Sequence, residues 1–220
     1  MTVRPLYSEL KSGASLLGLK LGVQQLDQLL DYLDLLQKWG KVYNLTSVRQ
    51  PAEMLTHHLL DSLAIVLPLE GQIARPGLAD VVKLLDVGSG AGLPGVVVAV
   101  CCPHIHVSCV DTVGKKAAFI QQAALSLGLP NLKGIHARVE NLPDAYDVVV
   151  SRAFASLVDF TFLSSKQMAP GALWLALKGK MPDVEIADLP ASVQVFHVEQ
   201  LAVPGLDAER CLVWMRPAAT

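Results

Sequence analysis

Apolar residues in this chain recur first at helical spacing and later in short continuous runs. Between residues 24 and 39, leucines fall three or four positions apart with acidic residues between them, which predicts an amphipathic helix. Residues 5–17 form a weaker helical pattern, and a further helix is expected to begin at Pro51. From residue 81 onward, apolar runs alternate with helical patterns. This alternation is typical of an α/β protein with a doubly wound sheet.

The apolar runs predict five strands, at residues 81–86, 106–110, 132–137, 146–150 and 171–177. Helical patterns are expected to begin near residue 96 and to cover residues 115–127, 157–168 and 182–189. Two later runs, 193–198 and 211–215, are expected to pair as a closing hairpin. Residues 71–80 contain Pro76 and Gly77 and are predicted to be a polar connection.

A glycine-rich stretch, KLLDVGSGAGLPG at residues 83–95, follows the first strand pattern. Asp86 ends the apolar run, and glycines then occupy alternate positions at Gly88, Gly90 and Gly92. Glycine adopts positive φ easily and allows a ligand to approach the backbone. Pro94 is suited to the first turn of a helix. The stretch therefore predicts a strand, a tight loop and a helix start, at the sheet edge where open α/β sheets bind ligands.

The spacing of the glycines favours one ligand class over another. A dinucleotide fingerprint, G-x-G-x-x-G, would need a third glycine where this chain has Leu93. The pattern D-x-G-x-G-x-G instead resembles the S-adenosylmethionine loop of class I methyltransferases, although a tight turn without a ligand is the structural alternative. We expect a Rossmann-like methyltransferase domain at residues 67–220 and an N-terminal helical cap at residues 1–66.

Polar residues at the ends of later elements are candidates for the site. Asp111 ends the second strand pattern nineteen residues after Gly92, a position from which an acidic side chain accepts bonds from ribose hydroxyls. His57 and His58 are adjacent, so they cannot share a helix face as a metal pair would. Asp61 lies four residues after His57 and is expected to hold its imidazole, more as a structural bond than a catalytic one.

Composition bounds the function further. The 220 residues are 52% hydrophobic with a formal net charge of −2, and no apolar run reaches the length of a membrane span. The first residues show no secretory signal pattern, and the four cysteines lack metal-ligand spacing, so we expect a cytoplasmic protein without a metal. Residues 111–180 hold eight basic and five acidic side chains, and this excess fits either a phosphate-binding face or an ordinary solvated surface.

Seven segments, taken in order, resemble the ribosomal RNA small-subunit methyltransferase G family, also called glucose-inhibited division protein B. They are WGKVYNLTSVRQPAEMLTHHLLDSL, LLDVGSGAGLPG, VDTVGKKAAFI, RVENLP, VVVSRAFASL, ALKGKMP and ERCLVWMRP. The resemblance implies transfer of a methyl group from S-adenosylmethionine to N7 of a guanosine in 16S ribosomal RNA. The partner would be that RNA or the small ribosomal subunit, and we expect a monomer.

The same resemblance implies the site residues. Cofactor contacts would come from Gly88 and Leu93, together with Gly90 and Gly92 of the same loop, and from Val139, Glu140 and Arg152; Asp111 fits the ribose role by position. The family's functional arginines correspond to Arg138, Arg152 and Arg210. Five basic residues are candidates for phosphate and base contacts: Arg138, Arg152, Lys178, Lys180 and Arg210.

The residue inventory agrees with transfer to guanine N7. That atom has a lone pair and no proton to lose, so no general base is needed and positioning with electrostatics is enough. The expected loops after the fourth and fifth strands, SRAF and LKGK, lack the cysteine of a cytosine C5 methyltransferase, and SRAF replaces the asparagine–proline–proline–aromatic tetrad of amino-group methyltransferases. A nicotinamide dehydrogenase, disfavoured by Leu93, and a non-catalytic RNA-binding protein are the alternatives from other classes.

Overall fold

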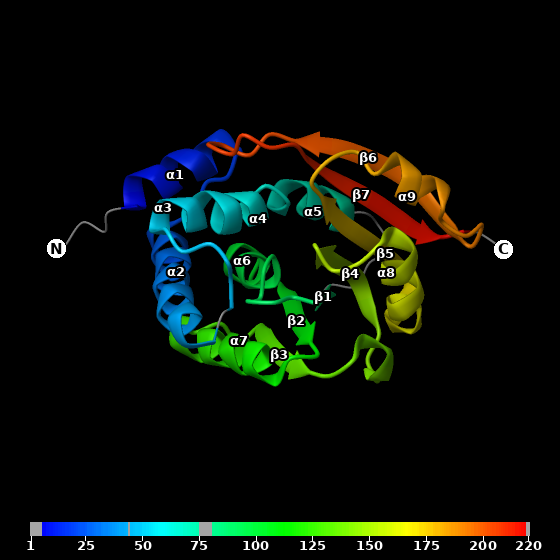
Figure 1. Cartoon of the computed structure of the whole chain (residues 1–220), viewed down its shortest axis with the longest axis horizontal. Helices are drawn as coiled ribbons and strands as arrows, with labels where there is room; N and C mark the ends of the chain where they lie inside the picture. Colours follow the sequence, from blue (N-terminus) through cyan, green and yellow to red (C-terminus); the bar gives the residue numbers. More distant parts are fainter. Residues whose placement is uncertain (1–5, 44, 75–80, 219–220) are drawn as a thin grey trace.

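A seven-stranded, mostly parallel sheet forms the centre of the molecule (Figure 1). The computed structural model describes residues 6–43, 45–74 and 81–218. The strand order is β3-β2-β1-β4-β5-β7-β6; β7 runs antiparallel to both of its neighbours, β5 and β6, and the other neighbouring pairs are parallel. The strands are β1 Val82–Val87, β2 Ile105–Asp111, β3 Leu132–His136, β4 Tyr146–Arg152, β5 Met168–Lys178, β6 Val193–Leu201 and β7 Arg210–Pro217. The five predicted parallel strands and the closing hairpin are confirmed.

Helices precede the sheet and alternate with its strands. The first group is α1 Tyr7–Leu16, α2 Val23–Tyr43, α3 Pro51–Met54, η1 Leu55–Leu60, α4 Asp61–Leu63 and α5 Val66–Ile73. The second is α6 Gly95–Cys101, α7 Gly114–Leu127, η2 Val139–Asn141, α8 Leu157–Ser164, η3 Ser165–Gln167 and α9 Asp183–Ala187. The segment α3–η1–α4 is one continuous helical run in which η1 is a π-helix, and it begins at Pro51 as predicted.

The two faces of the sheet bury different side chains because successive strand residues point to opposite sides. On β1, Leu84 joins an apolar cluster with α2, α6 and α7, whereas Leu85 and Val87 join a second cluster with α8. These two layers of helices are seen on either side of the sheet in Figure 1. Because both faces of the sheet are covered by helices, most residues of the central strands β1, β2 and β4 are buried, and these strands appear in the sequence as nearly continuous apolar runs.

The helix α2 is fastened to the sheet domain by polar side chains as well as by its leucines. Gln25 Nε2 donates to the carbonyl of Val100 (3.1 Å), Gln28 Nε2 to that of Leu127 (2.8 Å), and Tyr32 Oη to that of Ala91 (2.9 Å). The first two carbonyls lie at the ends of α6 and α7, and Ala91 belongs to the glycine loop. The division of the chain at residue 66 remains a prediction, and α5 starts at that position.

Two predicted boundaries around the fifth strand are wrong in detail. The helix expected to end at residue 168 stops at Ser164, and β5 begins at Met168 rather than at residue 171. Pro170 and Gly171, at the junction between the expected helix and the expected strand, lie within an irregular pairing: Tyr146 faces Met168, and the next pair is Val148 with Leu173. This bulge accommodates a proline and a glycine with φ of +79°.

Near the N-terminus, α2 continues through Gly40 to Tyr43, past the predicted end. The polar connection expected from residue 71 starts later, because α5 extends to Ile73; residues 75–80 lie outside the described part of the chain. Within the described ranges, none of the helices combines the length and apolar character that a bilayer crossing requires.

Candidate active site

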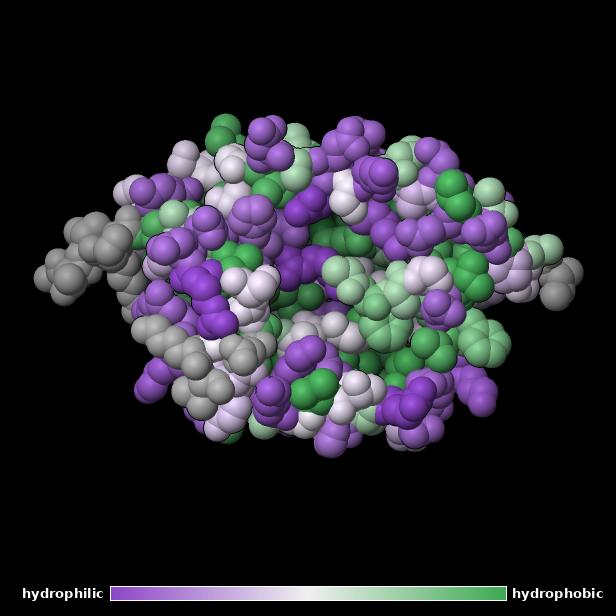
Figure 2. Space-filling view, in the orientation of Figure 1, coloured by the Kyte–Doolittle hydropathy of each residue, from purple (hydrophilic) through white to green (hydrophobic). Residues whose placement is uncertain are grey.

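Two adjoining pockets open at the carboxyl ends of the parallel strands. The first, about 600 Å³, is here called the arginine pocket and is lined by Asp61, Arg152 and Arg210 together with the glycine loop. The second, about 390 Å³, is here called the Asp111 pocket and is lined by Asp111, Arg138, Val139, Glu140 and Phe154. Gly88, Lys116 and Ala153 line both, so the pockets share a wall. Figure 2 shows this face hollowed near its centre, with hydrophilic side chains at the opening.

The glycine loop has left-handed backbone at each of its alternate glycines. Gly88, Gly90 and Gly92 have φ of +65°, +59° and +90°. A Cβ on Gly88 would collide with the Phe154 ring, and one on Gly92 would lie 2.8 Å from Val96. A Cβ on Gly90 would meet nothing within 4 Å, and Gly90 lines the arginine pocket. Gly88 and Gly92 are therefore required by packing, whereas the open side of Gly90 leaves room for a ligand.

Asp86, near the end of β1, holds the residue that follows the glycine loop, Gly95, from inside the protein. It is fully buried, and its Oδ2 accepts the main-chain N–H of Gly95 at 2.9 Å. Burial raises the pKa of Asp86 to about 7, against the opposing effect of the Gly95 bond and of Arg152. Its Oδ1 has no partner among the described residues. Asp86 thus anchors the start of α6 beside the loop.

Asp111 fixes the loop from the neighbouring strand. Its Oδ2 accepts the main-chain N–H of Gly90 at 3.0 Å, and its Oδ1 accepts that of Val113 at 2.8 Å. Lys116 Nζ lies 3.5 Å from Oδ2. Asp111 therefore shapes the loop as well as lining the pocket. Each carboxylate oxygen can accept more than one bond, so this geometry leaves acceptor capacity for a ligand.

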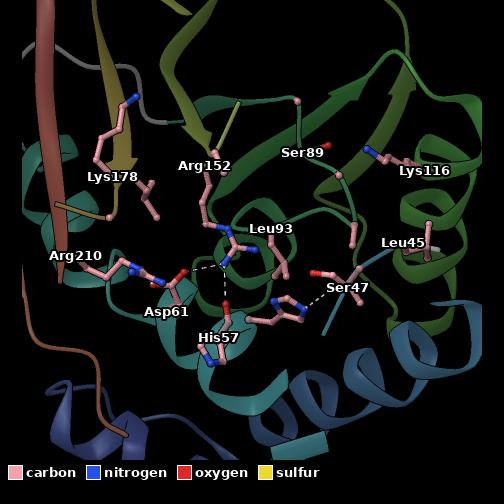
Figure 3. A pocket seen from close by; sticks show the side chains of 18 residues that line it. Leu45, Ser47, His57, Asp61, Ser89, Leu93, Lys116, Arg152, Lys178 and Arg210 are labelled. Carbon is pink, nitrogen blue, oxygen red and sulfur yellow. Dashed lines mark hydrogen bonds and ion pairs between the residues drawn. The ribbon is translucent and has the colours of Figure 1, made fainter. Parts of the chain in front are cut away.

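The arginine pocket is organised around a buried carboxylate (Figure 3). Asp61 Oδ2 accepts from Arg152 Nη1 at 2.9 Å, and Asp61 Oδ1 accepts from Arg210 Nε at 2.7 Å. Arg152 Nη1 also donates to the main-chain carbonyl of His57 at 3.1 Å. The side chain of Asp61 is 4% exposed, and those of Arg152 and Arg210 are 20% and 23% exposed. The expectation that Asp61 holds the imidazole of His57 is wrong, because the fold brings two arginines to its carboxylate.

His58 lines the same pocket as a neutral side chain. Its Nε2 lies 2.8 Å from Thr46 Oγ1. Burial, followed by the nearby Arg152 charge, lowers the pKa of His58 to about 4. Near neutral pH this ring therefore adds no positive charge to the pocket.

The remaining predicted residues divide between the two pockets. Arg138, Val139 and Glu140 line the Asp111 pocket, where Arg138 is 71% exposed and lies 3.5 Å from Glu140. The structure therefore does not bring Arg138 together with Arg152 and Arg210. Leu93 lines the arginine pocket, and Gly92 is absent from the residues that line either pocket.

The two lysines proposed as phosphate contacts also differ. Lys178 Nζ donates to the carbonyl of Ala155 (3.1 Å) and to Glu185 (2.7 Å), and its side chain points away from Asp61 in Figure 3. Lys178 therefore braces the loop after β4. Lys180 is exposed and outside the lining of both pockets.

Sequence reasoning missed Lys116 and gave Asp61 the wrong partner. Lys116 follows Asp111 by five residues in the first turn of α7, so the nearby acidic residue was an available signal. Asp61 is separated from Arg152 by 91 residues and from Arg210 by 149, and no local pattern links them.

Solved structures share this fold at low sequence identity. TrmN from Thermus thermophilus matches with a TM-score of 0.55 and 18% identity, over 74% of this chain and 53% of that one. A SAM-dependent methyltransferase from Aquifex aeolicus matches with a TM-score of 0.54 and 17% identity, over 78% and 96%. The predicted class I S-adenosylmethionine-dependent methyltransferase fold is confirmed.

Sequence relatives are much closer. A protein of Acidovorax ebreus (strain TPSY), named Ribosomal RNA small subunit methyltransferase G, is 65% identical over 96% of this chain and 95% of its own length. A protein of Polaromonas naphthalenivorans (strain CJ2) with the same name is 60% identical over 99% of each. The model of the family described as rRNA small subunit methyltransferase G matches residues 25–213. This chain belongs to the rRNA small subunit methyltransferase G family.

Proposed function

We propose that this chain transfers a methyl group from S-adenosylmethionine to N7 of a guanosine in 16S ribosomal RNA. The observation that carries the proposal is the near full-length match to relatives named for methylation of small-subunit ribosomal RNA, on a chain that keeps an open glycine loop. The proposed setting is a cytoplasmic monomer acting on that RNA, without a metal.

The residues around the loop fit the cofactor. The open side of Gly90 suits the amino-acid end of a ligand that passes close to the backbone, with Gly88 and Leu93 beside it. Asp111 supplies a carboxylate for ribose hydroxyls. Val139 is buried against the same pocket, and Glu140 adds a polar edge suited to an adenine. Gly92 contributes by letting the loop pack against α6 and α7.

The chain needs to do little chemistry of its own in this reaction. S-adenosylmethionine supplies an electrophilic methyl group on a positively charged sulfur. Guanine N7 offers a lone pair and releases no proton, so no residue is required as a general base, and His58 is not assigned that role. Orientation and charge placement are the tasks left to the side chains.

Arg152 and Arg210 are proposed to hold the RNA. Arginine grips phosphate oxygens with paired N–H groups and also donates to guanine O6 and N7. A bond to N7 would occupy the reacting lone pair, so the arginines must hold phosphate or O6 and leave N7 free. Arg138, at the exposed edge of the Asp111 pocket, is proposed to contact RNA or cofactor separately from this pair.

The test is methylation of 16S ribosomal RNA from cells that lack this modification. Purified protein and labelled S-adenosylmethionine are incubated with naked RNA, assembling particles and intact small subunits, and N7-methylguanosine is mapped by reduction and strand cleavage. The expected result is a single cleavage site in the RNA that appears after incubation with the protein and is absent when the protein is omitted. A protein that binds the cofactor but leaves every one of these substrates free of N7-methylguanosine would contradict the proposal.

A further inference from the structure

We infer that Asp61 is a positioning residue for methyl transfer, which fixes Arg152 and Arg210 in one orientation toward the RNA; this inference rests on the function proposed above. Asp61 comes from α4, Arg152 from the end of β4 and Arg210 from the start of β7. One carboxylate thus joins the N-terminal helices to two strands of the sheet. Figure 3 shows the two guanidinium groups approaching it from different elements.

The arrangement of the two arginines requires a planar carboxylate in which both oxygens accept hydrogen bonds. Each oxygen receives a different arginine, at 2.9 Å and 2.7 Å, so neither guanidinium can turn without breaking its bond. Arg152 is also held by the His57 carbonyl, and Arg210 Nη1 donates to the carbonyl of Glu209 at 2.7 Å. The two guanidinium groups are thereby already oriented when RNA arrives, so the reacting guanine can be held in line with the methyl group.

The π-helix η1 immediately before Asp61 contributes to this arrangement. It runs from Leu55 to Leu60, and it contains His57, whose carbonyl accepts from Arg152. Widened π turns occur often at functional sites, where they redirect backbone groups. Here the π turn and the following residue present two acceptors to the same guanidinium nitrogen.

The charges that line the arginine pocket show whether Asp61 could serve to attract RNA or only to position the arginines. Among the described residues that line the arginine pocket, Lys116, Arg152, Lys178 and Arg210 are cationic, and Asp61 is the sole carboxylate. A carboxylate there repels RNA phosphates, so attraction alone gives no reason for its presence. Removing its charge should leave RNA binding unchanged or tighter, while methyl transfer becomes slower because the arginines lose their orientation.

The first experiment compares Asp61→Asn with Asp144→Asn. Asp144 is half exposed and paired with Lys133 at 3.8 Å outside both pockets, so it controls for the loss of one carboxylate. For Asp61→Asn we expect single-turnover methyl transfer to fall by about tenfold to a hundredfold, since misplacement of about 1 Å costs roughly a hundredfold. We expect the KM for RNA to be equal to or below the wild-type value. A merely structural role would instead raise that KM along with any loss of rate.

The second experiment is a double-mutant cycle with Arg210→Lys. If Asp61 acts through the arginines, the double variant is no slower than Asp61→Asn alone, because the orientation is already lost. Multiplied rate losses would overturn the inference. Asp61→Glu keeps the charge but moves the carboxylate by one methylene, and we expect at least a tenfold slower transfer with cofactor binding retained.

The outcomes separate this inference from the proposed function. An active wild-type enzyme together with folded Asp61→Asn or Asp61→Glu variants at the wild-type rate overturns the role of Asp61 alone. If Asp61→Asn fails to fold, a wild-type rate for Asp61→Glu still overturns it, and slow transfer with an unchanged KM supports it. A wild-type protein that methylates none of the small-subunit RNA substrates contradicts the proposed function instead.

Discussion

The two pockets at the carboxyl edge of the sheet are built in different ways. Beside the Asp111 pocket, the glycine loop is held over a short sequence separation: the Gly90 N–H donates to Asp111, 21 residues further along the chain. The arginine pocket depends on side chains that are 91 and 149 residues from their common partner, Asp61. The loop and its bond to Asp111 should therefore be sensitive to backbone changes. The cluster around Asp61 should be sensitive to the exact identity of three charged side chains.

Burial shifts the pKa of two titratable groups, Asp86 beneath the glycine loop and His58 in the arginine pocket, in the direction of the neutral form. Beneath the loop it raises the pKa of Asp86 to about 7, and in the arginine pocket it lowers that of His58 to about 4. Both shifts favour the neutral form, as expected when a group loses water. The fixed charges left at the arginine pocket are then the arginines, two lysines and Asp61.

The largest effect is expected from Gly90→Val. Valine would have to adopt a left-handed φ of +59°, and its side chain would enter the open space beside the loop. We expect calorimetry with S-adenosylmethionine to show a loss of binding of more than about 100-fold, since strain and ligand overlap add. Gly71→Val, on an exposed turn of α5 with nothing within 4 Å, is the control and should bind normally. An unchanged dissociation constant for S-adenosylmethionine in a folded Gly90→Val protein would contradict the assignment of this loop to cofactor binding.

Next in size are the changes Arg152→Ala and Arg210→Ala, on the side of the arginine pocket that faces Asp61. Each should slow single-turnover methyl transfer with saturating RNA by tenfold to about a hundredfold, because the guanine is no longer held in line. Lysine at either position should be impaired less than alanine, since it lacks the paired N–H groups. Arg216→Ala, further along β7 and exposed, serves as the control with unchanged circular dichroism and rate. Wild-type rates in both lysine variants would mean that the arginines supply only general charge.

An effect of similar size, on cofactor affinity rather than on rate, is expected from Asp111→Ala. Loss of a charge-assisted bond to a ribose, together with the released Gly90 N–H, should weaken cofactor binding by about 1.5–3 kcal/mol. RNA affinity, measured by filter binding without cofactor, should stay unchanged because Asp111 lines the other pocket. The reverse outcome, weaker RNA binding with normal cofactor binding, would show that the ribose is placed wrongly.

The smallest effect concerns stability and pH. The pKa of Asp86 is raised in the folded protein, so the folded state holds its proton at pH values where the unfolded state has lost it. This contribution to stability is present at low pH and is lost as pH rises toward and through 7. Asparagine stays neutral, so the free energy of unfolding of Asp86→Asn relative to wild type should rise by about 2 kcal/mol between pH 5 and pH 8.

Urea denaturation at several pH values measures this difference. The opposite slope contributed by His58 is present in both proteins and cancels. Parallel stability curves for the two proteins would show that Asp86 does not titrate in this range. In that case the loop would be anchored by an ionised carboxylate.

The cofactor half of the site was largely predictable because it is local. Glycines at alternate positions after an apolar run determine a left-handed loop wherever the chain is placed, and Asp111 ends the adjacent strand. The strand runs, the helix at Pro51 and the closing hairpin were predictable for the same reason. The bulge at Pro170 and Gly171 was not, since the pairing of Tyr146 with Met168 depends on a neighbouring strand.

The arginine half was decided by tertiary structure. The sequence by itself indicated that Arg152 and Arg210 matter, through motifs, but it placed Arg138 with them and gave Asp61 to His57. Which cation meets a buried carboxylate depends on which strand ends lie beside α4, and that follows from the strand order β4-β5-β7 together with the packing of the N-terminal helices on the sheet. Backbone conformation is determined within a few residues, whereas the pairing of buried charges is determined by elements that approach only when the whole chain has folded.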